Sequence, residues 1–237
     1  MAARPAARSP DLPPEAYYVI VRGPLGAGKT TVARALAEAI RGRVVSIDEI
    51  LETLEWDGGS ERLFLRANDR AAAEARDAAA AGRPVVFDGN FYWRRVIDDL
   101  ARRLGWPHVV VTLRVPRSIC VVRDRDRPHS YGATAVRDVY ARVTRVRAGI
   151  PIDATGSVAQ TVDRIRAWLP RRSDLGTEAG RIKRRADAGR RSSGRSPGPA
   201  RAGGRNRASA SGGGRTSNGG ARPGPLRPAG RRAHRRG

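Results

Sequence analysis

The sequence predicts an α/β fold built on a doubly wound parallel sheet. Five short apolar runs alternate with stretches whose apolar residues recur at helical spacing. Strands that are apolar throughout are typical of a parallel sheet covered by helices on both faces. The alternation stops near residue 170, after which Arg, Gly, Ser and Pro dominate. We therefore expect one folded domain over 17–170, with a disordered N-terminus over 1–16 and a disordered tail over 171–237.

Each predicted strand is a short apolar run that leads into a turn residue. The five runs cover residues 17–21, 44–47, 85–87, 109–113 and 150–152. The fifth contains Pro151, which suits an edge strand because proline cannot donate to a ladder. The first three lead into Gly23, Asp48 and Asp88, so we expect these residues at the carboxyl edge of the sheet.

Each predicted helix has an apolar face, and several have a clear start or stop. Thr30 to Arg41 ends at Gly42, and Ser60 can cap a long Ala-rich helix that runs to Ala81. The remaining helices are expected over 94–104, through 119–123, over 134–147 and after Ser157.

Composition narrows the class of protein. The 237 residues include 46 Lys and Arg against 23 Asp and Glu, and residues 171–237 hold 19 of the basic residues but only 3 acidic ones. A single cysteine, Cys120, excludes an internal disulfide and a cysteine zinc site, and its apolar neighbours favour a core position. No apolar run is long enough for a membrane span, and the N-terminus lacks the apolar segment of a secretory signal. A cytoplasmic protein without membrane contact is therefore expected, and nothing indicates its oligomeric state.

A phosphate-binding loop is the strongest motif in the chain. Residues 23–30 fit the pattern G-x-x-x-x-G-K-[ST], with a predicted strand before them and a helix after them. Backbone N–H groups of such a loop surround phosphate oxygens, and the helix directs the positive end of its dipole at them. Lys29, the only lysine of residues 1–170, would reach the β- and γ-phosphates of a bound nucleotide. The Thr30 hydroxyl would join the shell of Mg²⁺, and Thr31 would bind the α-phosphate. The predicted nucleotide-binding residues are Gly23, Pro24, Leu25, Gly26, Ala27, Gly28, Lys29, Thr30 and Thr31.

Two aspartates follow apolar strands at the edge where ligands bind. Asp48, 19 residues after Lys29, is a candidate general base for an incoming hydroxyl group. Asp88 is a candidate ligand of Mg²⁺ beside Thr30, or a group that orients the acceptor. Each aspartate also suits the N-cap of a helix, and that alternative stays open.

An alternating Arg/Asp segment follows the fourth strand. Arg123 and Arg127 are spaced to share one side of a helix, and on a mobile loop they would stabilise the charge of a transferred phosphoryl group. The alternative is a solvated surface run, because arginine is plentiful in this chain.

The motifs occur in an order that resembles a known group of kinases. They are Gly23–Thr31, Ser46-Ile47-Asp48, Val85–Asn90, Arg123–Pro128 and Ile152–Gly156. They look like the small P-loop kinases around polynucleotide 5′-hydroxyl kinase, chloramphenicol phosphotransferase and zeta-toxin-type kinases, within the wider class of AAA-type ATP-binding domains. The resemblance implies strand order 2-3-1-4-5 and ATP as donor. It also implies Asp48 as the residue that activates the acceptor, Arg123 and Arg127 as lid arginines, and a turn at Thr155–Val158 near the adenine.

The leading functional prediction is an ATP-dependent phosphotransferase that acts on a hydroxyl group of a small molecule. Lys29, Asp48, Arg123 and Arg127 would be its catalytic residues, and ATP and Mg²⁺ its cofactors. One alternative is a nucleic-acid 5′-hydroxyl kinase, and another is a nucleotide-dependent switch with little transfer activity. The tail has no aromatic residue for stacking on bases, so it would bind nucleic acid only through phosphates and without sequence preference, or serve no specific role.

Overall fold

The computed structural model describes residues 16–170 of the chain. The segments predicted over 1–16, apart from residue 16, and over 171–237 lie outside the described residues. The strands are β1 (Tyr18–Arg22), β2 (Arg43–Ser46), β3 (Val85–Gly89), β4 (His108–Arg114) and β5 (Ile150–Asp153). The helices are α1 (Lys29–Ala39), α2 (Ile47–Glu52), α3 (Glu61–Ala80), α4 (Arg94–Leu104), α5 (Arg117–Arg125), α6 (Ala133–Arg145) and α7 (Val158–Arg166).

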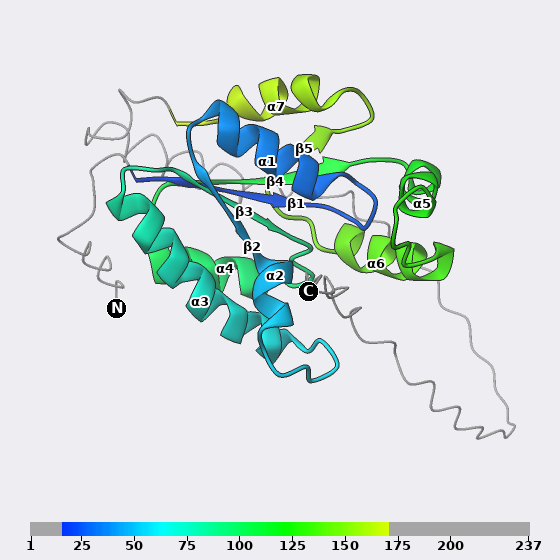
Figure 1. Ribbon diagram of the computed structural model, residues 1–237, viewed down its shortest axis with the longest axis horizontal. Helices are drawn as coiled ribbons and strands as arrows, with labels where there is room; N and C mark the ends of the chain where they lie inside the picture. Colours follow the sequence, from blue (N-terminus) through cyan, green and yellow to red (C-terminus); the bar gives the residue numbers. More distant parts are fainter. Residues whose placement is uncertain (1–15, 171–237) are drawn as a thin grey trace, which may run out of the picture. The chain divides into compact units, whose positions relative to one another are not determined.

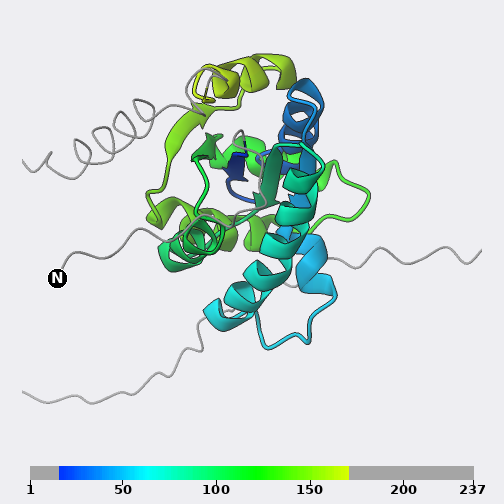
Figure 2. The same cartoon turned by 90° about the vertical axis from the view of Figure 1, so that its left-hand side faces the viewer.

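The strands form one parallel sheet in the order β2-β3-β1-β4-β5, which confirms the predicted fold class and strand order. Helices α1 and α7 cover one face of the sheet, and α3 and α4 cover the other (Figure 1). The view turned by 90° shows the same two helical layers (Figure 2). Helices α5 and α6 lie together beyond the carboxyl ends of the strands. The register sets Arg22, at the end of β1, beside Gly89 of β3 and Thr112 of β4.

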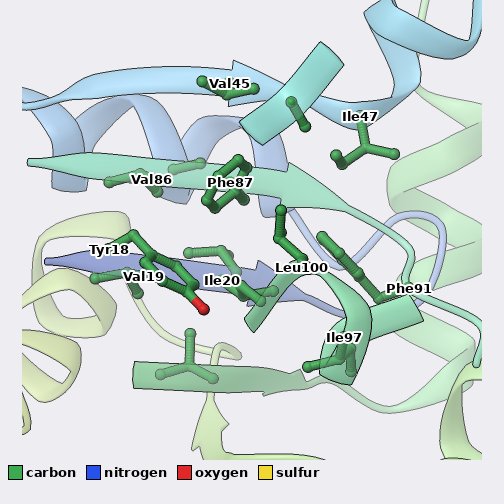
Figure 3. Close-up of a cluster of buried hydrophobic side chains, with 14 of the residues drawn as sticks. Tyr18, Val19, Ile20, Val45, Ile47, Val86, Phe87, Phe91, Ile97 and Leu100 are labelled. Carbon is green, nitrogen blue, oxygen red and sulfur yellow. The ribbon is translucent and has the colours of Figure 1, made fainter. Parts of the chain in front are cut away.

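The core is densest around the two central strands. Every residue of β1 and β3 is buried, as expected for strands that are covered on both faces. Figure 3 shows Ile20 and Phe87 on neighbouring strands with Leu100 and Ile97 of α4 packed close to them. Apolar burial of this kind fixes the sheet edge from which the functional loops start.

The structure corrects three local expectations. Helix α2 begins at Ile47, directly after β2, and Ser46 caps it by accepting the Glu49 N–H at 3.2 Å. Asp48 therefore lies in the first turn of α2 and is not its N-cap. Asp88 is not a cap either, because β3 continues through Gly89 and α4 starts only at Arg94. The apolar spacing after Ser157 predicts that Trp168 faces inward with Val162 and Ile165, but Trp168 lies beyond the end of α7 and is 50% exposed.

Across the described part of the chain, no helix combines the length and the apolar character needed to cross a membrane.

Candidate active site

The phosphate-binding loop connects β1 to α1 at the centre of the sheet. Its turn is closed by the Ala27 N–H, which donates to the Pro24 carbonyl at 3.1 Å. Gly26 and Gly28 adopt left-handed φ angles of 80° and 85°, which favour glycine. A Cβ at position 26 would also clash with the Cys120 carbonyl of α5. The loop conformation thus depends on glycine at these positions.

Lys29 begins α1 and lies back across the loop. Its Nζ donates to the Pro24 carbonyl at 3.2 Å, and the residue is 7% exposed. Burial lowers the pKa of Lys29, whereas the negative charges of Asp88 and Asp48 oppose that shift. The N-cap, Gly28, has no side chain to bind the first N–H groups of α1. A lysine beside these N–H groups suits the binding of phosphate oxygens.

Asp48 lies in the first turn of α2, half-buried at the carboxyl edge of the sheet. Burial, with a smaller contribution from the charge of Asp88, raises its pKa to about 6, while Lys29 opposes this shift. A carboxylate with a pKa near 6 is ionised at neutral pH and can still accept a proton in a reaction. Its position and pKa suit a general base.

Asp88 and Thr30 lie close together, as the sequence predicted for a magnesium site. Burial raises the pKa of Asp88, whereas the charge of Lys29 and the side chain of Thr30 oppose that shift. The Oδ1 atom of Asp88 is buried and has no hydrogen-bond partner within the described residues. One carboxylate and one hydroxyl fit Mg²⁺, which takes most of its remaining ligands from water and nucleotide phosphates. No cluster of three or more His, Cys, Asp or Glu suited to a metal occurs in residues 16–170.

Arg123 and Arg127 approach the loop from α5 and from the turn after it. Both terminal nitrogens of Arg123 donate to the Ala154 carbonyl, at 3.3 and 3.4 Å. A Cβ at position 28 would lie 4.0 Å from Nη1 of Arg123, so this guanidinium stands beside the phosphate-binding loop. Helix α5 ends at Arg125, so Arg127 is on the turn and not on the helix. The Arg127 side chain is exposed, and its charge lowers the pKa of Lys29.

A cluster of aromatic residues and one arginine next to Asp48 was not predicted from the sequence. The Arg142 guanidinium lies 4.7 Å from the ring centre of Tyr92 and 5.5 Å from that of Trp93. Burial raises the pKa of Tyr92, and the charge of Asp48 raises it further, so this ring lies near the candidate base. The only signal in the sequence was the pair Tyr92-Trp93, which follows the predicted strand closely.

Arg22 is a second residue that sequence reasoning missed. It is fully buried at the end of β1, one residue before the loop. Desolvation, followed by repulsion from Arg114, lowers its pKa to about 10. Its donors reach four acceptors on three surrounding segments, namely Thr112 Oγ1 and the carbonyls of Phe91, Val143 and Val146.

The strand order, the loop and the carboxylates beside it together define a P-loop kinase. Residues 19–150 match the AAA domain family, which is more than half of the chain. The chain therefore belongs to the AAA domain family.

Individual relatives agree with this class. The chain is 30% identical over 171 aligned residues to shikimate kinase 2 of Shigella boydii serotype 18, a match that covers 62% of this chain and 92% of that protein. A sugar kinase from Janibacter sp. HTCC2649 has the same fold, with a TM-score of 0.56, 19% identity and coverage of 69% of this chain and 99% of the other. The tunicamycin resistance protein of Deinococcus radiodurans aligns with a TM-score of 0.50 and 24% identity over 64% of this chain and 94% of the other. The chain is an ATP-dependent kinase that transfers a phosphoryl group to a small molecule.

Proposed function

We propose that this kinase transfers the γ-phosphoryl group of ATP to a hydroxyl group of a small molecule, with Asp48 as general base. The observation that supports this most is the half-buried Asp48 carboxylate, with a pKa near 6, on the same sheet edge as Lys29. A protein that only binds nucleotide has no need of such a base. Asp88, which is more deeply buried and lies beside Thr30, suits the metal better than the acceptor.

Each residue of the proposed site has a defined task in the transfer. Lys29 and the N–H groups of α1 bind the β- and γ-phosphates, and Arg123 and Arg127 stabilise the charge that develops on the transferred group. Thr30 and Asp88 would hold Mg²⁺, which neutralises phosphate charge when it is bound. The acceptor oxygen attacks the γ-phosphorus, its proton passes to Asp48, and the bond to the β-phosphate oxygen breaks to release ADP.

The acceptor is proposed to be a hydroxylated ring compound. Shikimate and sugars are the substrates that the names of two relatives state, and both are small molecules with several hydroxyl groups. In this chain Trp93, a partly exposed residue that directly follows the buried Tyr92, offers an aromatic surface near Asp48. The C–H groups of a ring can pack against such a surface. No arginine closely follows Asp48 in the sequence, and the cation on this side of the site is Arg142 of α6, which lies over Tyr92 and Trp93.

A binding screen tests the class of acceptor. Thermal unfolding would be followed with Mg²⁺ and a non-hydrolysable ATP analogue, in the presence of shikimate, aldoses, polyols or a 5′-hydroxyl oligonucleotide. We expect at least one small hydroxylated ring compound to raise the melting temperature further than the analogue alone. A shift with the oligonucleotide alone would contradict the proposal and favour the 5′-hydroxyl kinase. Hits would be tested for phosphorylated product by mass spectrometry.

A further inference from the structure

Asp124 differs from the other charged residues of the Arg/Asp segment. It is 1% exposed, although it belongs to a run that looks like an alternating surface pattern. Its Oδ2 accepts three hydrogen bonds, from Ser130 Oγ at 2.8 Å, from the Tyr131 N–H at 3.0 Å and from the Gly132 N–H at 3.1 Å. Asp126, two residues later, is exposed and pairs only with its neighbour Arg125 among the described residues.

The main chain of Asp124 holds the same turn from its other end. Its carbonyl accepts the Arg127 N–H at 3.2 Å, where α5 ends. The connection from Asp126 to Gly132 is thus held at both ends by Asp124. Its start is bonded to the Asp124 carbonyl, and its end is bonded to the Asp124 carboxylate. Burial of a carboxylate is costly unless hydrogen bonds compensate. Here three donors from one loop all bind Oδ2, while Oδ1 is buried without a hydrogen-bond partner among the described residues.

This loop carries one side chain to each half of the proposed site. Arg127 follows the end of α5, whose Cys120 carbonyl lies against Gly26 and whose Arg123 guanidinium stands beside Gly28 of the phosphate-binding loop. In keeping with this position, the charge of Arg127 lowers the pKa of Lys29. Tyr131 is partly buried against the hydrophobic core, and it contributes to the raised pKa of Tyr92, the ring near Asp48. If the loop moved away from Asp124, both side chains would move with it.

We propose that Asp124 is a positioning residue of the lid, which holds Arg127 over the transferred phosphoryl group. The inference rests on the proposed function, since it requires Arg127 to stabilise the transition state. Asp124 itself touches neither nucleotide nor acceptor. It removes the conformational freedom of the 126–132 loop before the reaction, so that the Arg127 charge is already in place when it is needed.

The test uses the full-length protein and ATP hydrolysis with water as acceptor, because this reaction needs no identified substrate. Asp124→Ala is compared with Asp124→Asn, which keeps a carbonyl acceptor, and with Asp126→Ala as the matched control. We expect Asp124→Ala to lower kcat about tenfold or more, with the MgADP dissociation constant within about twofold of wild type. Asp124→Asn should recover most of the rate, and Asp126→Ala should leave it unchanged. Hydrogen exchange at the Tyr131 and Gly132 amides should be faster in Asp124→Ala alone.

A double variant separates this inference from the proposed function. If Asp124 acts through Arg127, the double variant that carries Asp124→Ala and Arg127→Ala should hydrolyse ATP at a rate within about twofold of Arg127→Ala alone. Fully additive losses would overturn the inference and leave the lid role of Arg127 intact. A wild-type rate in Arg127→Ala would overturn both the inference about Asp124 and the proposed lid role of Arg127. If Asp124→Ala does not fold, Ser130→Ala is used instead, because it removes one of the three hydrogen bonds to Asp124. It should lower kcat less than Asp124→Ala would, and it should lower kcat no further when Arg127→Ala is already present.

Discussion

Arg22 donates from Nη2 to the Val143 carbonyl at 2.9 Å, and this bond joins the central strand to the last turn of α6. The same guanidinium also reaches the Phe91 carbonyl, at 3.3 Å. Phe91 has a φ of 47°, an unfavourable conformation for a bulky residue, and it directly precedes Tyr92. One buried side chain therefore fixes the backbone on both sides of the aromatic and arginine cluster next to Asp48.

Replacement of Arg22 should destabilise the fold strongly. In Arg22→Ala the carbonyls of Phe91, Val143 and Val146 lose their buried donors, so we expect the free energy of unfolding to fall by about 3 kcal/mol or more. Arg114→Ala is the matched control, because its side chain is exposed and should contribute within about 0.5 kcal/mol. Urea unfolding measures both variants, and a loss in Arg22→Ala no larger than in the control would contradict this role.

Asp99 should stabilise the contact between α3 and α4 in a pH-dependent way. It is 7% exposed, and its Oδ2 accepts from Asn68 Nδ2 at 3.0 Å and from Arg103 Nε at 2.6 Å. We expect Asp99→Ala to cost about 2 kcal/mol at pH 7, because it leaves the buried Asn68 amide without this acceptor. Asp98→Ala, which breaks only an exposed pair with Arg94, should cost about 0.5 kcal/mol or less.

The pH dependence of the Asp99 contribution follows from its pKa. Burial would raise this pKa, but the hydrogen bonds from Arg103 and Asn68 outweigh burial and lower it. Because this pKa is lowered by folding, Asp99 adds to the free energy of unfolding at pH values above its pKa in the unfolded chain. That contribution is lost as the pH falls through the pKa of Asp99 in the folded protein. Urea unfolding at pH 7 and pH 3 should therefore show a smaller difference between Asp99→Ala and wild type at pH 3. An equal difference at the two pH values would argue against this electrostatic origin.

Lys29 should be needed for nucleotide binding and transfer. Lys29→Ala removes the only lysine of residues 1–170 from the centre of the loop, so we expect ATP-dependent transfer to be abolished and MgATP binding to be greatly weakened. Arg62→Ala, an exposed cation on α3, serves as control for a simple loss of positive charge. Isothermal calorimetry gives the affinities, and wild-type binding and turnover in Lys29→Ala would refute the assignment of the loop.

Turnover should rise with pH as Asp48 ionises. Burial raises the pKa of Asp48 to about 6, and only the carboxylate form can accept the acceptor proton, so kcat/KM should increase through about pH 6. The stability effect has the opposite sign. The protonated form of Asp48 is favoured in the folded state. Its contribution to the free energy of unfolding is therefore present below about pH 4 and is lost as pH rises through about 6. Asp48→Asn should lack both effects, and a flat rate profile between pH 5 and pH 7 in the wild type would rule out Asp48 as the base.

The fold was largely predictable because its signals are local. Five apolar runs and the helical spacing between them gave the doubly wound sheet, and the loop pattern around Lys29 located the phosphate-binding site. The N-cap of α2 is Ser46, two residues before the Asp48 cap that the sequence left open. Both are good cap residues, and the end of β2 at Ser46 decides between them.

The rest of the site depends on contacts between residues far apart in the sequence. Arg142 meets Tyr92 across 50 residues, and Arg22 reaches Val143 across 121, so neither could be read from spacing. The two aspartates of the Arg/Asp segment look alike in the sequence. Only the return of the loop at Ser130 to Gly132 buries Asp124 and leaves Asp126 exposed.

The most direct test of the central claim is phosphoryl transfer by Asp48→Asn in a single turnover. Wild-type protein and the variant would be mixed with Mg²⁺, γ-labelled ATP and an acceptor from the binding screen, and the labelled product would be counted against time. We predict that Asp48→Asn binds MgATP with wild-type affinity but forms product about 10² to 10⁴ times more slowly. Product formation at the wild-type rate in Asp48→Asn would contradict the account.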